Sequence, residues 1–202
     1  VSLDKIAHTL LQQSLPLINA TQVWTNGYTG KGQTICIIDS GINYSHPDFG
    51  GCFGSGCKVL GGYDYVNSDT DPMDDFYHGT HVAGIAAAKG KINGTAPDAK
   101  LIAMKACNQN GNCFTSDMED SIKWCTVNRA AYNISIISIS IGNNNSYSES
   151  NCPPDLEIDI NNATRYNISV IISSGNNNLT NGVSWPACRG NATSVGAVYD
   201  AN

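Results

Sequence analysis

The stretch Gln33-Thr34-Ile35-Cys36-Ile37-Ile38-Asp39 is a short apolar run rich in isoleucine, with Gly32 before it and Ser40-Gly41 after it. Such a run predicts a buried strand of a parallel sheet. Its only charged residue, Asp39, comes last, and open α/β sheets place ligands and reacting groups at the carboxyl ends of their strands. Asp39 is therefore a candidate site residue, although an Asp in this position is about equally often a turn or helix cap.

A second stretch, His78-Gly79-Thr80-His81-Val82-Ala83-Gly84-Ile85-Ala86, predicts a helix that begins at His78. Val82, Ile85 and Ala86 have helical spacing, and Gly90 stops the pattern. A lone His in the first turn of a helix is more often structural than chemical. An imidazole together with a carboxylate, however, is the pair that an enzyme uses to activate a hydroxyl nucleophile.

Strands and helices alternate along the rest of the chain. Further strands are expected at 99–105, 134–141 and 169–174, and helices from Ser116 and over 153–165. Ser116 and Glu119 have the spacing of a capping box. This alternation predicts an α/β fold, doubly wound, with a mainly parallel sheet flanked by helices.

The chain has 202 residues, of which 41% are hydrophobic and 14% charged, and its formal net charge is −6. These values predict a single folded domain with a substantial core. The negative charge argues against nucleic acid as a partner, and no apolar run is long enough to cross a membrane. No signal peptide is recognisable, so we expect the chain to begin after a processing or expression cut.

Further motifs extend the two stretches in a fixed order. They are Ile38-Asp39-Ser40-Gly41-Ile42, Ser45-His46-Pro47-Asp48-Phe49, His78-Gly79-Thr80-His81-Val82-Ala83-Gly84, Ser138-Ile139-Ser140-Ile141-Gly142, and Ser173-Ser174-Gly175-Asn176 followed by Trp185-Pro186-Ala187 and Ser194-Val195-Gly196-Ala197-Val198. In this order they resemble the subtilisin-like serine proteases, or subtilases, from about residue 15 to the end. The resemblance implies a subtilisin-like sheet that is incomplete at the C-terminus.

By this resemblance the chain is part of a secreted serine endopeptidase. Asp39 matches the carboxylate of the catalytic triad, His78 the general base, and Asn176 the side-chain donor of the oxyanion hole. The family's nucleophile lies in a Gly-Thr-Ser-x-Ala motif, which this sequence does not contain. Ser194 aligns with a family strand instead, so we expect a C-terminal segment outside this chain to supply the catalytic Ser.

The resemblance also implies how a substrate binds. Protein or peptide substrates lie as an extended strand against Ser140-Ile141-Gly142, with Gly111, Ser174 and Gly175 as further contacts. In the family, a segment such as 1–20 joins a propeptide to the catalytic domain, here 21–202. A surface arm packed on the sheet is the alternative for residues 1–20.

Eight cysteines agree with an exported, extracellular protein. Local bridges are plausible in two short loops, Cys52–Cys57 and Cys107–Cys113, and the resemblance places Cys152 near Cys188. Cys36 and Cys125 remain, either bridged or free in the core. Glycosylation sequons, which are typical of secreted proteins, start at Asn19, Asn43, Asn93, Asn133, Asn144, Asn162, Asn167, Asn178 and Asn191.

An acidic loop before His78 predicts a structural calcium ion, because alternating oxygen side chains on a tight loop can wrap a hard cation. Asp64, Asn67, Asp69 and Asp71 match a calcium loop of thermostable subtilases, and a solvated acidic loop is the alternative. Asp48 matches another family calcium ligand, but the loop that would complete that site, 89–94, is short.

Two other functions compete with the protease. One is a catalytically inactive pseudoprotease, which the pairing of Asp39 and His78 with Asn176 argues against. The other is a calcium-stabilised binding or surface module, favoured by the acidic loop and the sequons.

Overall fold

In a computed structural model of the chain, which describes residues 11–178 and 180–198, six strands form one parallel sheet in the order β2-β3-β1-β4-β5-β6. The strands are β1 (Thr34–Asp39), β2 (Val59–Asp64), β3 (Lys100–Lys105), β4 (Ile134–Ile139), β5 (Ser169–Ser173) and β6 (Thr193–Val195). The helices are α1 (Leu11–Leu17), α2 (Ala20–Thr25), α3 (His78–Ala87), α4 (Thr115–Val127), α5 (Arg129–Tyr132) and α6 (Glu157–Arg165), with short 3-10 helices η1 (Pro47–Phe49) and η2 (Glu149–Asn151). The predicted fold class is confirmed.

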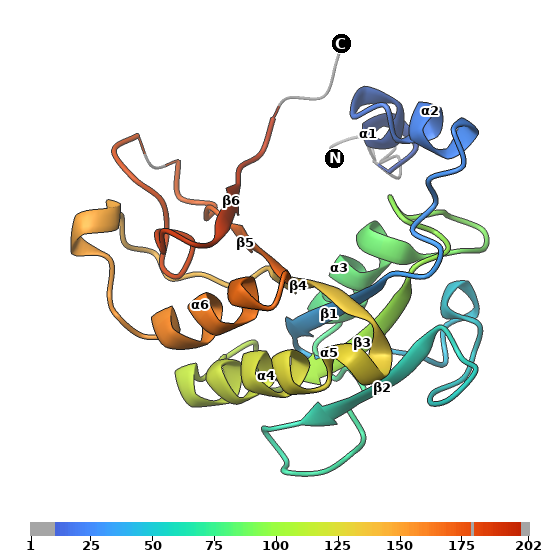
Figure 1. Cartoon of the computed structure of the whole chain (residues 1–202), viewed down its shortest axis with the longest axis horizontal. Coiled ribbons are helices and arrows are strands. Elements are labelled where there is room, and N and C mark those ends of the chain that lie inside the picture. Colours follow the sequence, from blue (N-terminus) through green and yellow to red (C-terminus); the bar gives the residue numbers. More distant parts are fainter. Residues whose placement is uncertain (1–10, 179, 199–202) are drawn as a thin grey trace, which may run out of the picture.

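The central strand β1 is buried along its whole length because helices cover both faces of the sheet (Figure 1). Ile35 and Ile37 pack in one core cluster with the alanines of α3. Cys36 and Ile38 point to the other face and pack in a second cluster with α4 and α6. The alternation of side chains along a strand therefore explains why this run is apolar at every position before Asp39.

The order of the strands brings the chain's polar strand ends together. β1 lies between β3 and β4, and β4 also pairs with β5. Because the strands are parallel, Asp39 and the residues that follow β3, β4 and β5 lie at one edge of the sheet. The candidate site is built at this edge.

One strand was not predicted. β2 contains Gly61-Gly62, which weakens the strand pattern in the sequence. A Cβ on Gly62 would lie 1.9 Å from the carbonyl oxygen of Ala103 on β3, so no larger residue fits there without a shift of the backbone. Glycine is therefore needed where β2 lies against Ala103 of β3.

Element boundaries also differ from the prediction. The predicted helix over 153–165 begins only at Glu157, directly after Leu156, whose left-handed backbone (φ 65°) cannot be part of a right-handed helix. The capping box at Ser116 is wrong: α4 begins at Thr115, and the Ser116 hydroxyl lies 3.4 Å from the Asp117 carboxylate instead. The predicted strand 134–141 ends at Ile139.

Four disulfides cross-link the fold: Cys36–Cys125, Cys52–Cys57, Cys107–Cys113 and Cys152–Cys188. The two local bridges and the Cys152–Cys188 pair are as predicted. Of the two alternatives for Cys36 and Cys125, the structure has the bridged one, which ties β1 to α4 through the core.

The N-terminal arm or propeptide junction predicted at 1–20 lies partly outside the described residues. Of this segment the structure describes α1, and the predicted boundary at residue 21 falls just after α2 begins. Among the described helices, none combines the length and the apolar character needed to cross a membrane.

Candidate active site

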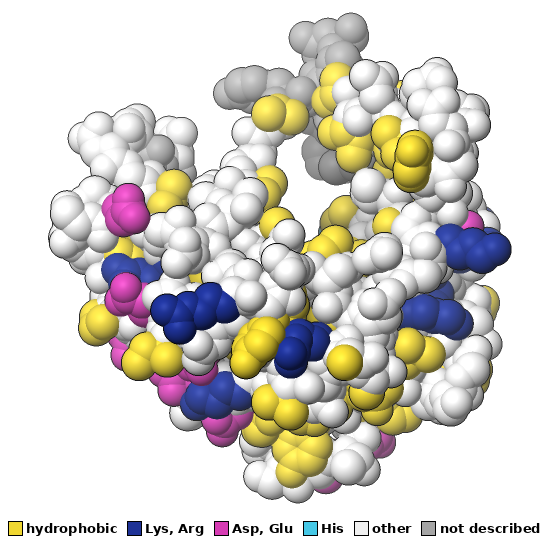
Figure 2. All heavy atoms as spheres, viewed as in Figure 1, with side chains coloured by type: hydrophobic (Ala, Val, Ile, Leu, Met, Phe, Trp, Pro, Cys, Tyr) yellow, Lys and Arg dark blue, Asp and Glu magenta, His cyan; other side chains and the backbone are white. Residues whose placement is uncertain are grey.

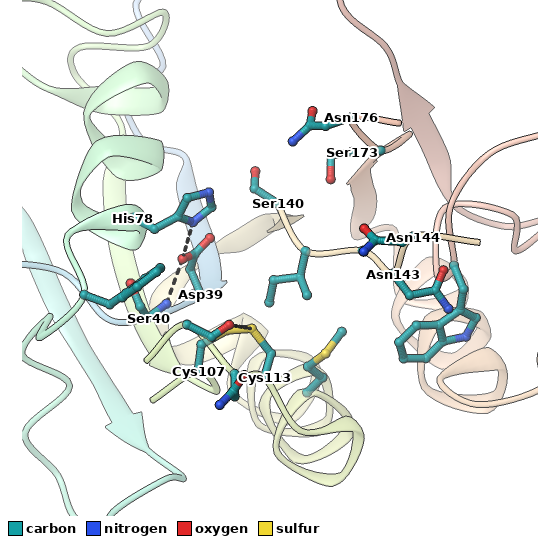
Figure 3. Close-up of a pocket in the computed structure, with 18 of the residues that line it drawn as sticks. Asp39, Ser40, His78, Cys107, Cys113, Ser140, Asn143, Asn144, Ser173 and Asn176 are labelled. Carbon is teal, nitrogen blue, oxygen red and sulfur yellow. Dashed lines mark hydrogen bonds and ion pairs between the residues drawn. A yellow bond between two sulfur atoms is a disulfide. The ribbon is translucent and has the colours of Figure 1, made fainter. Parts of the chain in front are cut away.

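Asp39 and His78 meet at the carboxyl edge of the sheet. Asp39 ends β1, His78 begins α3, and His78 Nδ1 lies 2.7 Å from Asp39 Oδ1 (Figure 3). Asp39 is 1% exposed, and the same oxygen accepts the backbone N–H of Ser40 at 2.8 Å. The carboxylate is therefore fixed, while the imidazole reaches the neighbouring pocket.

The environment makes His78 a stronger base than an ordinary histidine. Its hydrogen bond to Asp39 raises its pKa most, burial lowers it in part, and the negative charges of Asp39 and Asp74 raise it further. With Nδ1 donating to the carboxylate, Nε2 is the nitrogen that can accept a proton. The pair can thus take a proton from a nucleophile and stabilise the imidazolium that forms.

A close approach between β1 and α3 makes this pair possible. A Cβ on Gly79 would lie 2.1 Å from the carbonyl oxygen of Gly41, so only glycine fits directly after His78. Tyr77, directly before it, has a left-handed backbone with φ 66°. This conformation is uncommon for a bulky residue and turns the chain sharply into α3.

Asp74 is a site residue that the sequence analysis missed. Its carboxylate accepts hydrogen bonds from five groups, namely the Ser40 hydroxyl (2.8 Å), the backbone N–H of Phe76 (2.9 Å), Tyr77 (2.8 Å) and Thr80 (2.9 Å), and the Thr80 hydroxyl. The Ser40 hydroxyl in turn accepts the Gly79 N–H at 2.9 Å. Asp74 therefore ties the end of β1 to the first turn of α3, on either side of the Asp39–His78 contact. A carboxylate four residues before a helix that begins with His is the sequence signal that could have identified it.

Lys105 was also missed, although it ends β3 as Asp39 ends β1. It is 1% exposed. Its ammonium donates to the carbonyl oxygens of Ser40 and Cys107, each at 3.1 Å, and pairs with the Asp75 carboxylate. These contacts hold the loops around Asp39 in place.

A pocket of about 420 Å³ extends from the Asp39–His78 pair across the ends of β4 and β5. Most of the predicted site residues line it: Asp39, His78, Gly111, Ser140, Ile141, Gly142, Gly175 and Asn176. Figure 3 shows His78 and Asn176 on facing sides of this space. The pocket therefore places the His78 imidazole opposite the Asn176 carboxamide.

Ser174, also predicted as a substrate contact, is not among the lining residues. Its backbone N–H donates to Val195 of β6 at 2.8 Å, and its carbonyl accepts from Ser184 at 2.8 Å, so both groups are used within the fold. Ser173 lines the pocket instead.

The loop that carries Gly111 forms another part of the pocket wall. The Cys107–Cys113 disulfide closes it, and Gly111 has φ 76°. A Cβ on Gly111 would lie 2.5 Å from the Phe76 ring, so glycine is needed both for the backbone angle and for the space.

The four residues predicted to bind calcium take part in hydrogen bonds within and beside their loop. Both oxygens of Asp64 accept hydrogen bonds from Asn67, at 2.9 Å and 2.8 Å. Asp69 accepts from the Asp71 N–H, and Asp71 accepts from the Tyr44 hydroxyl. Within residues 11–178 and 180–198, no three Asp, Glu, His or Cys side chains are placed to hold a metal ion. Calcium binding at 64–71 remains a prediction.

At Asp48 the short loop closes directly on the carboxylate. Asp48 Oδ1 accepts the Lys91 N–H at 2.9 Å, and its backbone carbonyl accepts the Lys89 N–H at 2.9 Å. A Cβ on Gly90 would lie 2.2 Å from Asp48 Oδ1. The backbone thus takes the place where a longer loop would bring further oxygen ligands.

Comparison with known proteins identifies a protein family whose model matches most of this chain. Residues 30–202 match the model of the subtilase family. The chain is 37% identical over 184 residues to a thermophilic serine proteinase of Bacillus sp. (strain AK1), covering 88% of this chain and 41% of the relative. It is 37% identical over 142 residues to the minor extracellular protease Vpr of Bacillus subtilis, covering 66% and 17%. Against subtilisin E of the same species it is 34% identical over 209 residues, covering 98% of this chain and 50% of the relative. The chain thus spans half or less of the length of these relatives.

Proposed function

The chain belongs to the subtilase family, and from this premise we propose that it supplies the general base, its orienting carboxylate and an oxyanion donor of a serine endopeptidase. The observation that carries the proposal is the 2.7 Å contact between His78 Nδ1 and the buried Asp39, at the edge of a pocket that Asn176 also lines.

In the proposed mechanism, His78 Nε2 takes the proton of a serine hydroxyl as that oxygen attacks the carbonyl carbon of the peptide bond. Asp39 holds the imidazole in the tautomer that leaves Nε2 free, and it stabilises the imidazolium. The Asn176 carboxamide donates to the oxygen that becomes negative. His78 then gives the proton to the leaving amine, and water repeats the cycle on the acyl-enzyme.

The backbone of 140–142 supports an extended substrate. Among the described residues, Ser140, Ile141 and Gly142 make no hydrogen bond through their backbone N–H or carbonyl groups. They follow β4 and line the pocket, so a peptide can pair with them as an added strand. Another part of the pocket wall is polar, because it is lined by Asn143, Asn144 and Asn177.

The serine itself is proposed to come from a segment that is not in this sequence, since no Gly-Thr-Ser-x-Ala motif occurs in it. A propeptide is the second proposed partner. An extracellular location is supported by four disulfides, which persist in oxidising compartments, and by the name of the Vpr relative. Glycosylation remains a prediction.

The test is labelling of the native preparation with a serine-directed fluorophosphonate, read by intact mass after denaturation and reduction. Label on a second polypeptide is the expected result. His78→Ala should abolish the labelling, whereas His81→Ala, which removes an exposed imidazole one turn along α3, should leave it intact. A wild-type preparation that contains a second polypeptide and still takes up no label would refute the proposal and favour the pseudoprotease. A preparation with neither label nor second polypeptide would be an inactive fragment of the protease.

A further inference from the structure

A cluster of lysines surrounds a cavity at the opposite edge of the sheet. The cavity has a volume of about 520 Å³ and is lined by Lys31, Lys58, Lys89, Pro97, Asp98, Ala99 and Lys100. Lys58 directly precedes β2, Lys100 begins β3, and Lys31 lies in the segment that enters β1. These strands are neighbours, so the lysines gather where three parallel strands begin. Strands of six residues place this cavity about 20 Å from Asp39.

The fold holds two of the ammonium groups at the cavity wall with donors to spare. Lys58 Nζ donates to the carbonyl oxygens of Pro97 and Ala99, at 2.7 Å and 2.9 Å. Lys100 Nζ donates to the carbonyl of Cys57 at 2.7 Å. An ammonium group has three N–H donors, so Lys58 keeps one and Lys100 two beyond these contacts.

The cluster is an exception in an acidic chain. Four of its lining residues are lysines and one is an aspartate, while the chain carries a formal net charge of −6. The Asp98 carboxylate is already paired with Lys89 at 2.5 Å. Figure 2 shows Lys and Arg side chains on the right, near the segment that Figure 1 draws from α2 into β1, and further Lys and Arg side chains at the centre and on the left, where most of the visible Asp and Glu side chains lie.

Burial and the neighbouring positive charges both disfavour the charged form of Lys58. Burial lowers the pKa of Lys58 most, and the charge of Lys100 lowers it further, against the opposing effect of Asp98; with the charge of Lys89 added, the pKa is about 8. Near pH 8 the Lys58 ammonium is thus half deprotonated, a state that a bound anion would reverse.

We propose that this lysine cluster is a binding site for a small, multiply charged oxyanion of the phosphate or sulfate class. The spare N–H donors of Lys58 and Lys100 bind its oxygens, and Lys31 adds a further positive charge. The anion relieves the repulsion among the lysines and links the starts of β1, β2 and β3. The site is separate from the pocket at Asp39 and does not depend on the proposed peptidase.

The test is isothermal titration of the 202-residue chain with sodium phosphate at pH 8.5, against sodium chloride of equal ionic strength. Saturable binding of phosphate is expected. The measured heat should change between two buffers of different ionisation enthalpy, because the Lys58 amine takes up a proton when the anion binds. Lys58→Gln should remove this proton uptake.

Matched variants locate the site. Lys31→Gln with Lys89→Gln removes two exposed charges without disturbing the core, and it should weaken phosphate binding by about tenfold or more. Lys123→Gln, on the surface of α4, should leave affinity unchanged. The proposal fails if no saturable heat appears, if the double variant binds as tightly as the wild type, or if binding takes up no proton.

Discussion

Replacing Asp74 should lower both the stability of the fold and the pKa of His78. The Asp74 carboxylate accepts hydrogen bonds from five donors close to His78, and its charge raises the pKa of that imidazole. Of these donors, only the Ser40 hydroxyl belongs to a fully buried residue, at 0% exposure. The N–H groups of Phe76, Tyr77 and Thr80 belong to less buried residues, so water can replace part of what they lose. A buried donor left without an acceptor costs about 1–3 kcal/mol.

Asp74→Ala should therefore lower the free energy of unfolding by about 3–5 kcal/mol, counting one buried donor in full and the others in part. Asp74→Asn should cost less, about 1–2 kcal/mol, because its amide oxygen can still accept from Ser40, Phe76 and Tyr77. Its NH₂ group would face the Thr80 N–H, and that contact is lost. Both variants remove a negative charge that raises the pKa of His78, so this pKa should fall.

Urea unfolding of the chain measures the first effect, and NMR titration of the His78 ring protons measures the second. Asp120→Asn is the matched control, since Asp120 is a surface carboxylate on α4 that pairs only with Lys123 among the described side chains. The reasoning is refuted if Asp74→Asn unfolds within 0.5 kcal/mol of the wild type, or if the titration of His78 is the same in both proteins.

Three further predictions follow from the site and the acidic loop. In a preparation that contains the nucleophile, Asn176→Ala should lower kcat by about 10²–10³-fold, a magnitude measured in subtilisin rather than worked from this structure; Asn161→Ala on α6 should leave kcat unchanged, and equal losses in the two variants would contradict the oxyanion role. The pKa of His78 is raised in the folded chain, so the stabilising contact with Asp39 is complete below about pH 6.5 and is lost as the pH rises through the raised value. The loss of stability in Asp39→Asn, from urea unfolding, should thus be larger at pH 6 than at pH 9, and a loss that grows with pH would contradict this sign. For the loop 64–71, the calcium prediction implies that addition of EDTA lowers the melting temperature, and an unchanged melt would contradict it.

Most of the fold could be predicted because its signals are local. The apolar run before Asp39 and the helical spacing after His78 each lie within one element, and burial on both faces of the sheet acts on every residue of β1. β2 could not be predicted in this way. Its Gly61-Gly62 pair carries no strand signal of its own. The need for glycine at Gly62 arises only from the distance to Ala103, which lies on β3, 41 residues further along the chain.

The site shows which features could not be predicted from local sequence, because two residues in the same position on the fold have different roles. Asp39 ends β1 and Asp64 ends β2, and both are buried. The carboxylate of Asp64 is satisfied by Asn67, three residues on, so it closes its own loop. The carboxylate of Asp39 is bound by His78, 39 residues on, and can act on a second side chain. The one local donor to Asp39, the Ser40 N–H, binds Oδ1 and leaves this oxygen able to accept from His78 as well. Whether His78 reaches it depends on how Gly79 and Asp74 set α3 against β1. Those contacts join residues that are close only in the folded chain, so Asp74 and Lys105 were missed although each lies within a few residues of a predicted element end.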